Sequence, residues 1–236
     1  MSNYEYVREN YSALLSEVEE YERCFGRSIT VVAVTKSGTD EELLALAEAG
    51  VTDVGENRPT ELARRGKLLK ENGYSPRLHE IGNLQRNKVK LVIGEASLIH
   101  SVGKYELAEE ISRQAVKLGI TVPVLIEVNS ANEPLKGGVA PENTEALFLK
   151  IRELPGISVK GLMTMGPALD DQEDMRPYFK LTKEIFDRIN EAYGFDGGIL
   201  SMGMSDSYAV AIEEGSTLIR VGRKIFEKMK GDKRNV

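Results

Sequence analysis

The chain has 236 residues, of which 41% are hydrophobic and 29% are charged, the balance of a soluble globular protein. Its net charge of −6 gives no general attraction to nucleic acid or to anionic membranes. No apolar run approaches the ~20 residues of a membrane span, and the N-terminus lacks the basic-then-apolar pattern of a signal peptide. The single cysteine, Cys24, excludes an intrachain disulfide and a cysteine-based zinc site. We therefore expect a cytoplasmic protein.

Short β-branched runs alternate with helical patterns along the whole chain. This alternation predicts parallel strands covered by helices, and eight such units favour a closed (β/α)8 TIM-type barrel over an open doubly wound sheet. No Pro- or Ser-rich linker interrupts the pattern, so we expect one domain over residues 1–236. The predicted strands are 30–35, 53–56, 77–81, 98–102, 122–129, 159–165, 199–204 and 218–221.

Helix signals lie between these runs. An acidic first turn opens the segment 40–49, and Gly50 stands where a left-handed C-cap belongs. Pro141 starts another helix at the position where its missing N–H is harmless. The other predicted helices are 3–21, 104–117, 174–193 and 208–214.

Lys36 directly follows the first predicted strand. An amine at the carboxyl end of a buried strand costs free energy unless something uses it. Partial burial also lowers the pKa of a lysine, which favours the neutral, nucleophilic amine of Schiff-base chemistry. The alternative is a lysine at a strand–loop junction that keeps its ammonium in water at little cost.

Polar residues recur at the carboxyl ends of the predicted strands, the face on which the chemistry of such barrels sits. Singly, each is explained by a helix cap or a turn, but the set predicts a ligand site. Ser205 leads from the seventh strand into a helix, and Gly222 follows the eighth. Helix starts bind anions, glycine allows close backbone approach, and phosphate sites recur after strands seven and eight. A phosphate site is therefore predicted there.

At these residues the chain resembles the pyridoxal phosphate homeostasis protein family, which consists of barrels related to the alanine racemase N-terminal domain. Each matching motif is short, but together they occur in order over nearly the whole chain and are specific. The motifs are Ala33-Val34-Thr35-Lys36, Gly55-Glu56-Asn57, Ile81-Gly82-Asn83-Leu84-Gln85-Arg86-Asn87-Lys88, His100-Ser101-Val102, Gly161-Leu162-Met163, Leu200-Ser201-Met202-Gly203-Met204-Ser205 and Gly215-Ser216-Thr217-Leu218-Ile219-Arg220-Val221-Gly222.

The resemblance implies a fold type III barrel for pyridoxal 5′-phosphate (PLP), without the C-terminal β domain of the racemases. It implies that Lys36 forms an internal aldimine with PLP and that Arg220 lies against the pyridine nitrogen. Ser205, with the backbone of Gly222 and Arg223, is implied to receive the phosphate. Ser201 is a second implied candidate for the phosphate site, and Asn57 and His79 are implied pocket neighbours.

Several positions depart from the family pattern. Leu78 precedes His79 where an aromatic residue is usual, and Glu80 replaces an apolar residue. Val54 stands where an aromatic residue is usual before Gly55-Glu56-Asn57. Arg223 replaces a small polar residue, so a phosphate hydroxyl contact is in question while the backbone N–H remains. We expect the Arg223 side chain to face solvent.

An arginine stays protonated and can only donate to the pyridine nitrogen, which leaves the ring a poorer electron sink than a pyridinium. Racemisation also needs an acid or base on the opposite face of the cofactor, and no pattern aims Tyr74 or Tyr208 there. We therefore expect a monomer that holds PLP and delivers it to apo PLP-dependent enzymes with little or no turnover. A slow PLP-dependent amino-acid racemase and a Schiff-base aldolase acting on a phosphosugar remain as alternatives.

Overall fold

Within residues 4–134, 136–169 and 171–228, which the computed structural model describes, eight parallel strands close into a barrel. Each strand pairs with the next, and the last pairs back with the first, so the predicted (β/α)8 fold class is confirmed. The strands are β1 (Thr30–Val34), β2 (Asp53–Glu56), β3 (Arg77–Glu80), β4 (Leu98–Val102), β5 (Val122–Glu127), β6 (Ile157–Met163), β7 (Ile199–Ser201) and β8 (Leu218–Val221).

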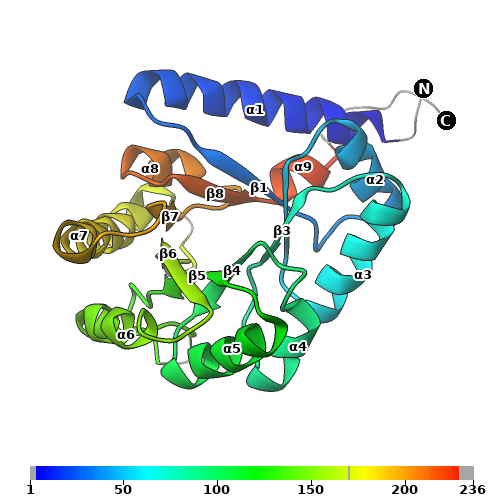
Figure 1. Cartoon of the computed structure of the whole chain (residues 1–236). Coiled ribbons are helices and arrows are strands. Elements are labelled where there is room, and N and C mark those ends of the chain that lie inside the picture. Colours follow the sequence, from blue (N-terminus) through cyan, green and yellow to red (C-terminus); the bar gives the residue numbers. More distant parts are fainter. Residues whose placement is uncertain (1–3, 135, 170, 229–236) are drawn as a thin grey trace.

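Helices surround the barrel, and α1 (Glu5–Phe25) lies across its outside next to α2 and α9 (Figure 1). The others are α2 (Asp40–Glu48), α3 (Pro59–Glu71), α4 (Val89–Val92), α5 (Tyr105–Leu118), α6 (Thr144–Ile151), α7 (Arg176–Tyr193), α8 (Tyr208–Glu213) and α9 (Arg223–Phe226). Short 3-10 turns precede three of them, at η1 (Arg86–Lys88), η2 (Pro141–Asn143) and η3 (Glu173–Met175).

The ends of several strands were wrongly predicted. β7 stops at Ser201 rather than 204 because Gly203 takes a φ of 90°, which a strand cannot accommodate. β1, β3 and β5 also end earlier than predicted, and β6 begins and ends two residues earlier. Apolar residues continue past the paired backbone into buried loop positions such as Met202, so the hydrophobic run overestimates the strand.

The structure also adds α3, α4 and α9, which the sequence pattern did not single out. α3 buries only Leu62, Arg65 and Leu69 among its 13 residues, so its apolar face is too narrow to mark a helix clearly.

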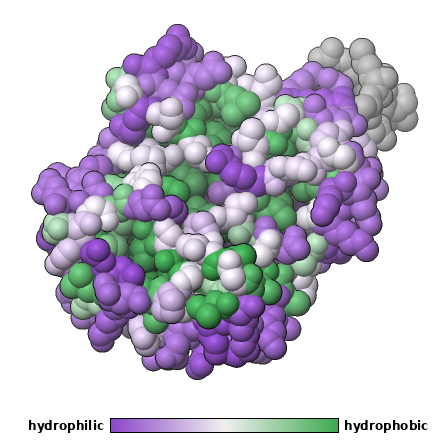
Figure 2. Space-filling model, viewed as in Figure 1, coloured by the Kyte–Doolittle hydropathy of each residue, from purple (hydrophilic) through white to green (hydrophobic). Residues whose placement is uncertain are grey.

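Two apolar layers hold the barrel together. Side chains of β1, β4, β5, β6 and β8 fill the interior as one cluster, and a larger cluster packs the outer side of the strands against the helices. In the view of Figure 2, hydrophilic residues dominate the outer rim of the molecule and apolar ones gather further in. None of the described helices is long and apolar enough to cross a bilayer.

Gly161 marks a position where β6 tolerates no side chain. Its φ is 150°, and a Cβ atom there would overlap the backbone carbonyl oxygen of Ile199 on β7. We expect Gly161→Ala to lower the free energy of unfolding by about 3–5 kcal/mol, because strand pairing must distort. The matched control is Gly26→Ala, where φ is 62° but no atom lies within 4 Å, and the expected loss is about 1–2 kcal/mol. Urea unfolding measures both, and equal losses would contradict this account.

Candidate functional site

Lys36 lies in the turn between β1 and α2 and is exposed. The predicted partial burial was wrong, because β1 ends at Val34 and the turn carries Lys36 out of the barrel core. Lys36 nevertheless borders a pocket of about 310 Å³. The residues that line this pocket are Lys36, Ser37, Glu56, Asn57, Arg58, Glu61 and Arg65.

A buried arginine fixes the backbone of the Lys36 turn. Arg65 of α3 donates to the carbonyl oxygens of Thr35 and Gly38, the second at 2.6 Å, so both sides of Lys36 are held. Its charge is balanced by Glu56 at the end of β2, 2.7 Å away. The Thr35 hydroxyl donates to the same carboxylate. The lysine backbone is therefore fixed while its side chain is free.

Nothing in the sequence analysis pointed to Arg65, although a signal was present. Arg65 shares a helix face with Leu62 and Leu69, at spacings of three and four residues, and all three are buried. A charged residue on the apolar face of a helix needs a buried partner, which indicates a structural ion pair.

Ser205 and Gly222 meet at the carboxyl ends of β7 and β8. The Gly222 N–H donates to the Ser205 hydroxyl oxygen over 3.2 Å. A Cβ atom at Gly222 would lie 2.9 Å from the Val34 carbonyl oxygen, so glycine lets the end of β8 approach β1. Arg223 begins α9, is exposed and pairs with Asp206. The two segments of the predicted phosphate site are thus adjacent.

Arg220 and Ser201 meet inside the barrel. Arg220 is 4% exposed, and its guanidinium donates to the Ser201 hydroxyl and, over 3.0 Å, to the Thr164 carbonyl. Burial lowers the pKa of Arg220 to about 10, and the nearby Glu127 carboxylate opposes the shift. Arg220 is therefore a hydrogen-bonded cation at neutral pH.

The other two expected neighbours lie apart from each other. Asn57 is exposed and lines the pocket beside Lys36. His79 is buried in the barrel interior, where its ring contacts Asp53 and His100 at 2.8 and 2.9 Å. His100 in turn lies 3.1 Å from the Ser201 hydroxyl, so His79 reaches Arg220 only through these intermediates.

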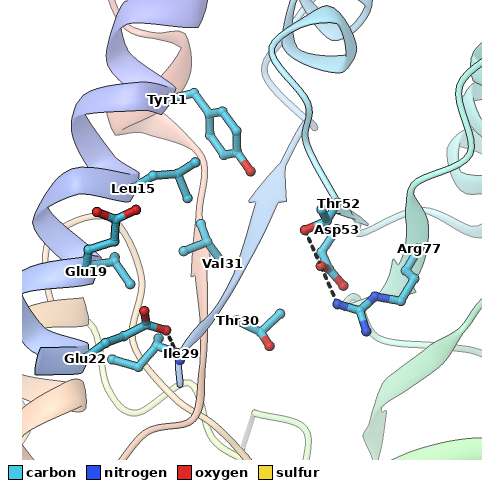
Figure 3. Close-up of a pocket in the computed structure, with 11 residues that line it drawn as sticks. Tyr11, Leu15, Glu19, Glu22, Ile29, Thr30, Val31, Thr52, Asp53 and Arg77 are labelled. Atoms are coloured by element: carbon cyan, nitrogen blue, oxygen red, sulfur yellow. Dashed lines mark hydrogen bonds and ion pairs between the residues drawn. The ribbon is translucent and has the colours of Figure 1, made fainter. Parts of the chain in front are cut away.

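A second pocket, of about 280 Å³, lies at the opposite end of the barrel, where β1, β2 and β3 begin (Figure 3). Tyr11, Glu19 and Glu22 of α1 form one wall, and Asp53 and Arg77 form the other. This pocket contains none of the predicted ligand residues.

Glu80 is one of the departures from the family pattern. It is a buried carboxyl at the end of β3. Burial raises its pKa to about 8, the neighbouring Glu56 charge adds to the shift, and the Gly82 N–H opposes it. One carboxyl oxygen accepts from Gly82 at 3.2 Å, and the other has no hydrogen-bond partner among the described residues. Glu80 is therefore mostly protonated at neutral pH.

The chain that forms this closed parallel barrel matches the family model of the alanine racemase N-terminal domain over residues 10–227. Among curated relatives, the pyridoxal phosphate homeostasis protein of Aquifex aeolicus is 42% identical over 200 residues, covering 85% of this chain and 87% of that protein. The chain belongs to the pyridoxal phosphate homeostasis protein family.

Solved structures show the same barrel. PipY of Synechococcus elongatus with PLP bound is 25% identical and matches with a TM-score of 0.82, covering 94% of this chain and 100% of that chain. Alanine racemase of Clostridium difficile is 20% identical with a TM-score of 0.72, and 98% of this chain covers 58% of it. At this identity, the likeness to alanine racemase shows the fold alone.

Glu80 should make stability depend on pH. Its folded pKa of about 8 lies above the ordinary value of 4.5, so its contribution is full below pH 4.5 and is lost as the pH rises towards 8. Glu80→Gln, which mimics the protonated form, should therefore gain stability relative to wild type between pH 5 and pH 9, by on the order of 2–4 kcal/mol. Urea unfolding at several pH values measures the gain.

The control is Glu20→Gln on the exposed side of α1, which should follow the wild-type profile. Parallel profiles for wild type and Glu80→Gln would show that Glu80 does not take up a proton on folding.

Proposed function

We propose that this protein binds pyridoxal 5′-phosphate on Lys36 and serves in its intracellular homeostasis and delivery, with little or no turnover. The observation that carries the proposal is the pairing of β1 with β8, which brings Gly222, hydrogen-bonded to Ser205, beside Val34, two residues before Lys36. The proposed binding residues are Lys36, Asn57, His79, Ser201, Ser205, Arg220, Gly222 and Arg223.

The donors present suit each part of this molecule. Lys36 offers a primary amine bordering a pocket, which suits an aldehyde. Ser205 accepts from Gly222 and keeps its own proton to donate to a phosphate, to which the Arg223 backbone N–H at the start of α9 can also donate. Arg220 can only donate, which suits an unprotonated pyridine nitrogen.

Lys36 would hold PLP through its amine, and bound PLP would supply the aldehyde for which that amine is the partner. The residues of this chain provide the amine, the anion donors and the ring partner.

Weak turnover is supported by the position of the two tyrosines considered for acid–base work. The Tyr208 hydroxyl donates to Glu17 of α1 and accepts from Lys224, and burial raises its pKa. Tyr74 precedes β3, at the end of the barrel opposite Lys36. Neither hydroxyl is placed for proton transfer at the Lys36 end.

We further infer that the protein acts in the cytoplasm as a one-domain monomer and passes PLP to apo PLP-dependent enzymes. The low charge attraction to nucleic acid and membranes, and the exposed position of Lys36, are consistent with exchange between proteins in solution.

Replacement of Lys36 tests the attachment. Protein loaded with PLP should show a visible absorbance band, and borohydride should then fix one PLP mass on the chain by reducing the imine. Lys36→Ala should lose both the band and the mass increase, because no amine remains at that position. The control is Lys67→Ala on α3, an exposed lysine that pairs with Glu71, and it should behave as wild type. An unchanged band in Lys36→Ala would overturn the assignment.

The alternative function is a slow amino-acid racemase, which the alanine racemase fold suggests. The loaded protein is incubated with single-enantiomer amino acids, and α-deuterium exchange is followed in heavy water. Little or no exchange is expected, and sustained turnover that Lys36→Ala abolishes would replace the carrier function by catalysis.

A further inference from the structure

A chain of hydrogen bonds crosses the barrel interior and ends at Arg220. Asp53 contacts His79 at 2.8 Å, His79 contacts His100 at 2.9 Å, and His100 contacts the Ser201 hydroxyl at 3.1 Å. Arg220 donates to the same hydroxyl. All five residues are at most 4% exposed, so protein groups rather than bulk water must satisfy their side chains.

The far end of this chain is a firmly ionised carboxylate. Burial alone would raise the pKa of Asp53, but hydrogen bonds from His79, Arg77 and Thr52 outweigh it and lower the pKa to about 2. Arg77 and Thr52 both donate to the Asp53 oxygen that does not face His79, at 2.7 and 2.8 Å (Figure 3). Asp53 can therefore only accept a hydrogen bond from His79.

The direction of every bond follows from this fixed end. His79 must carry a proton on Nε2 to donate to Asp53, and a neutral ring then accepts at Nδ1. His100 therefore donates from Nε2 and accepts at Nδ1, which only the Ser201 hydroxyl can fill as donor. Ser201 in turn accepts from Arg220.

The other proton arrangements leave a defect. If a neutral His79 carried its proton on Nδ1, the lone pair of its Nε2 would face a lone pair of the Asp53 carboxylate. A doubly protonated His79 would force His100 to donate to Ser201, whose hydroxyl would then accept from both His100 and Arg220. Among the described residues its proton would have no acceptor, because Ser201 Oγ contacts only those two side chains. Burial, and to a lesser extent the nearby Arg220 charge, also lowers the pKa of His100 well below its usual value, which keeps that ring neutral.

We propose that Asp53, His79 and His100 form a one-directional positioning chain that commits the Ser201 proton to His100 and turns the Ser201 lone pairs towards Arg220. In this chain both histidines are neutral Nε2–H tautomers. The positioning chain orients groups and does not transport protons, because one end is an ionised carboxylate and the other is a protonated arginine. One consequence rests on the proposed PLP site. There, Asp53 at one end of the barrel would fix, through the positioning chain, the Arg220 guanidinium that would meet the ring nitrogen.

The tautomers can be measured directly in the protein without cofactor. The sequence contains two histidines, and both belong to the positioning chain. Imidazole 15N–1H correlation spectra are therefore free of other histidine signals. We expect two neutral rings protonated on Nε2 at pH 7. A doubly protonated ring, or a proton on Nδ1 of either histidine, would overturn the proposal without any variant.

Asp53→Asn tests whether the residues act as one unit. Arg77 and Thr52 hold the oxygen of the new amide, so its NH2 group faces His79 and donates to Nε2. His79 must then carry its proton on Nδ1, and His100, which does not contact residue 53, must follow. Both rings are expected to switch to the Nδ1–H form. A switch at His79 alone would show that no chain exists.

Glu19→Gln is the matched control, since Glu19 lines the same pocket as Asp53 and makes no hydrogen bond to the described residues of the positioning chain. It undergoes the same acid-to-amide change, and both rings should keep the wild-type tautomer. A switch in this variant would attribute the effect to lost pocket charge and overturn the hydrogen-bond account.

The effect on the cofactor is measured separately. In Asp53→Asn the PLP dissociation constant should rise by roughly 2–10-fold, since the hydrogen bond between Ser201 and His100 is reversed and Arg220 must share the Ser201 lone pairs with His100. Absence of any PLP band in wild type would contradict the proposed function and leave the tautomer result standing. A wild-type band with an unchanged dissociation constant in Asp53→Asn would overturn the positioning role.

Discussion

The pairing of β1 with β8 is the constraint from which the candidate site arises. It closes the barrel in a register that sets Val32 beside Arg220 and Ala33 beside Val221. Residues separated by nearly the whole chain therefore leave the sheet at the same place, with Lys36 on one side and Gly222 on the other. Gly222 makes the approach possible, because any Cβ atom there would press on the Val34 carbonyl. Without this closure, the lysine and the anion donors would be unrelated in space.

Buried charge, normally costly, is arranged here so that it orients functional groups. Arg65 and Glu56 neutralise each other outside the strands, and the remaining donors of Arg65 hold the backbone around Lys36. Asp53 and Arg220 are joined inside the barrel by two imidazoles and a hydroxyl instead of by direct contact. Arg65 thus holds the turn that carries Lys36, and Arg220 is itself held by the Ser201 hydroxyl and the Thr164 carbonyl.

The fold could be predicted because strand and helix periodicity is a local property of the sequence, and eight alternating units leave few arrangements. Strand ends were harder, since buried loop residues such as Met202 look like strand residues. The burial of Lys36 was wrongly predicted for the same reason: a strand one residue shorter moves the lysine into an exposed turn. The His79–His100 contact depends on strand register and on which side chains face inward, and neither can be predicted from local sequence patterns.

An exposed lysine on a rigid turn suits a carrier better than an enzyme. An imine exchanges with water and with other amines, and both must reach it for the aldehyde to be released. A buried lysine would slow that release, whereas Lys36 combines an accessible side chain with a backbone that Arg65 holds still. In the proposed function, retention would then come from the rest of the molecule, through the Ser205–Gly222 donors and the Arg220 guanidinium. The proposed covalent bond would select the aldehyde, and the fixed donors would determine how long it stays.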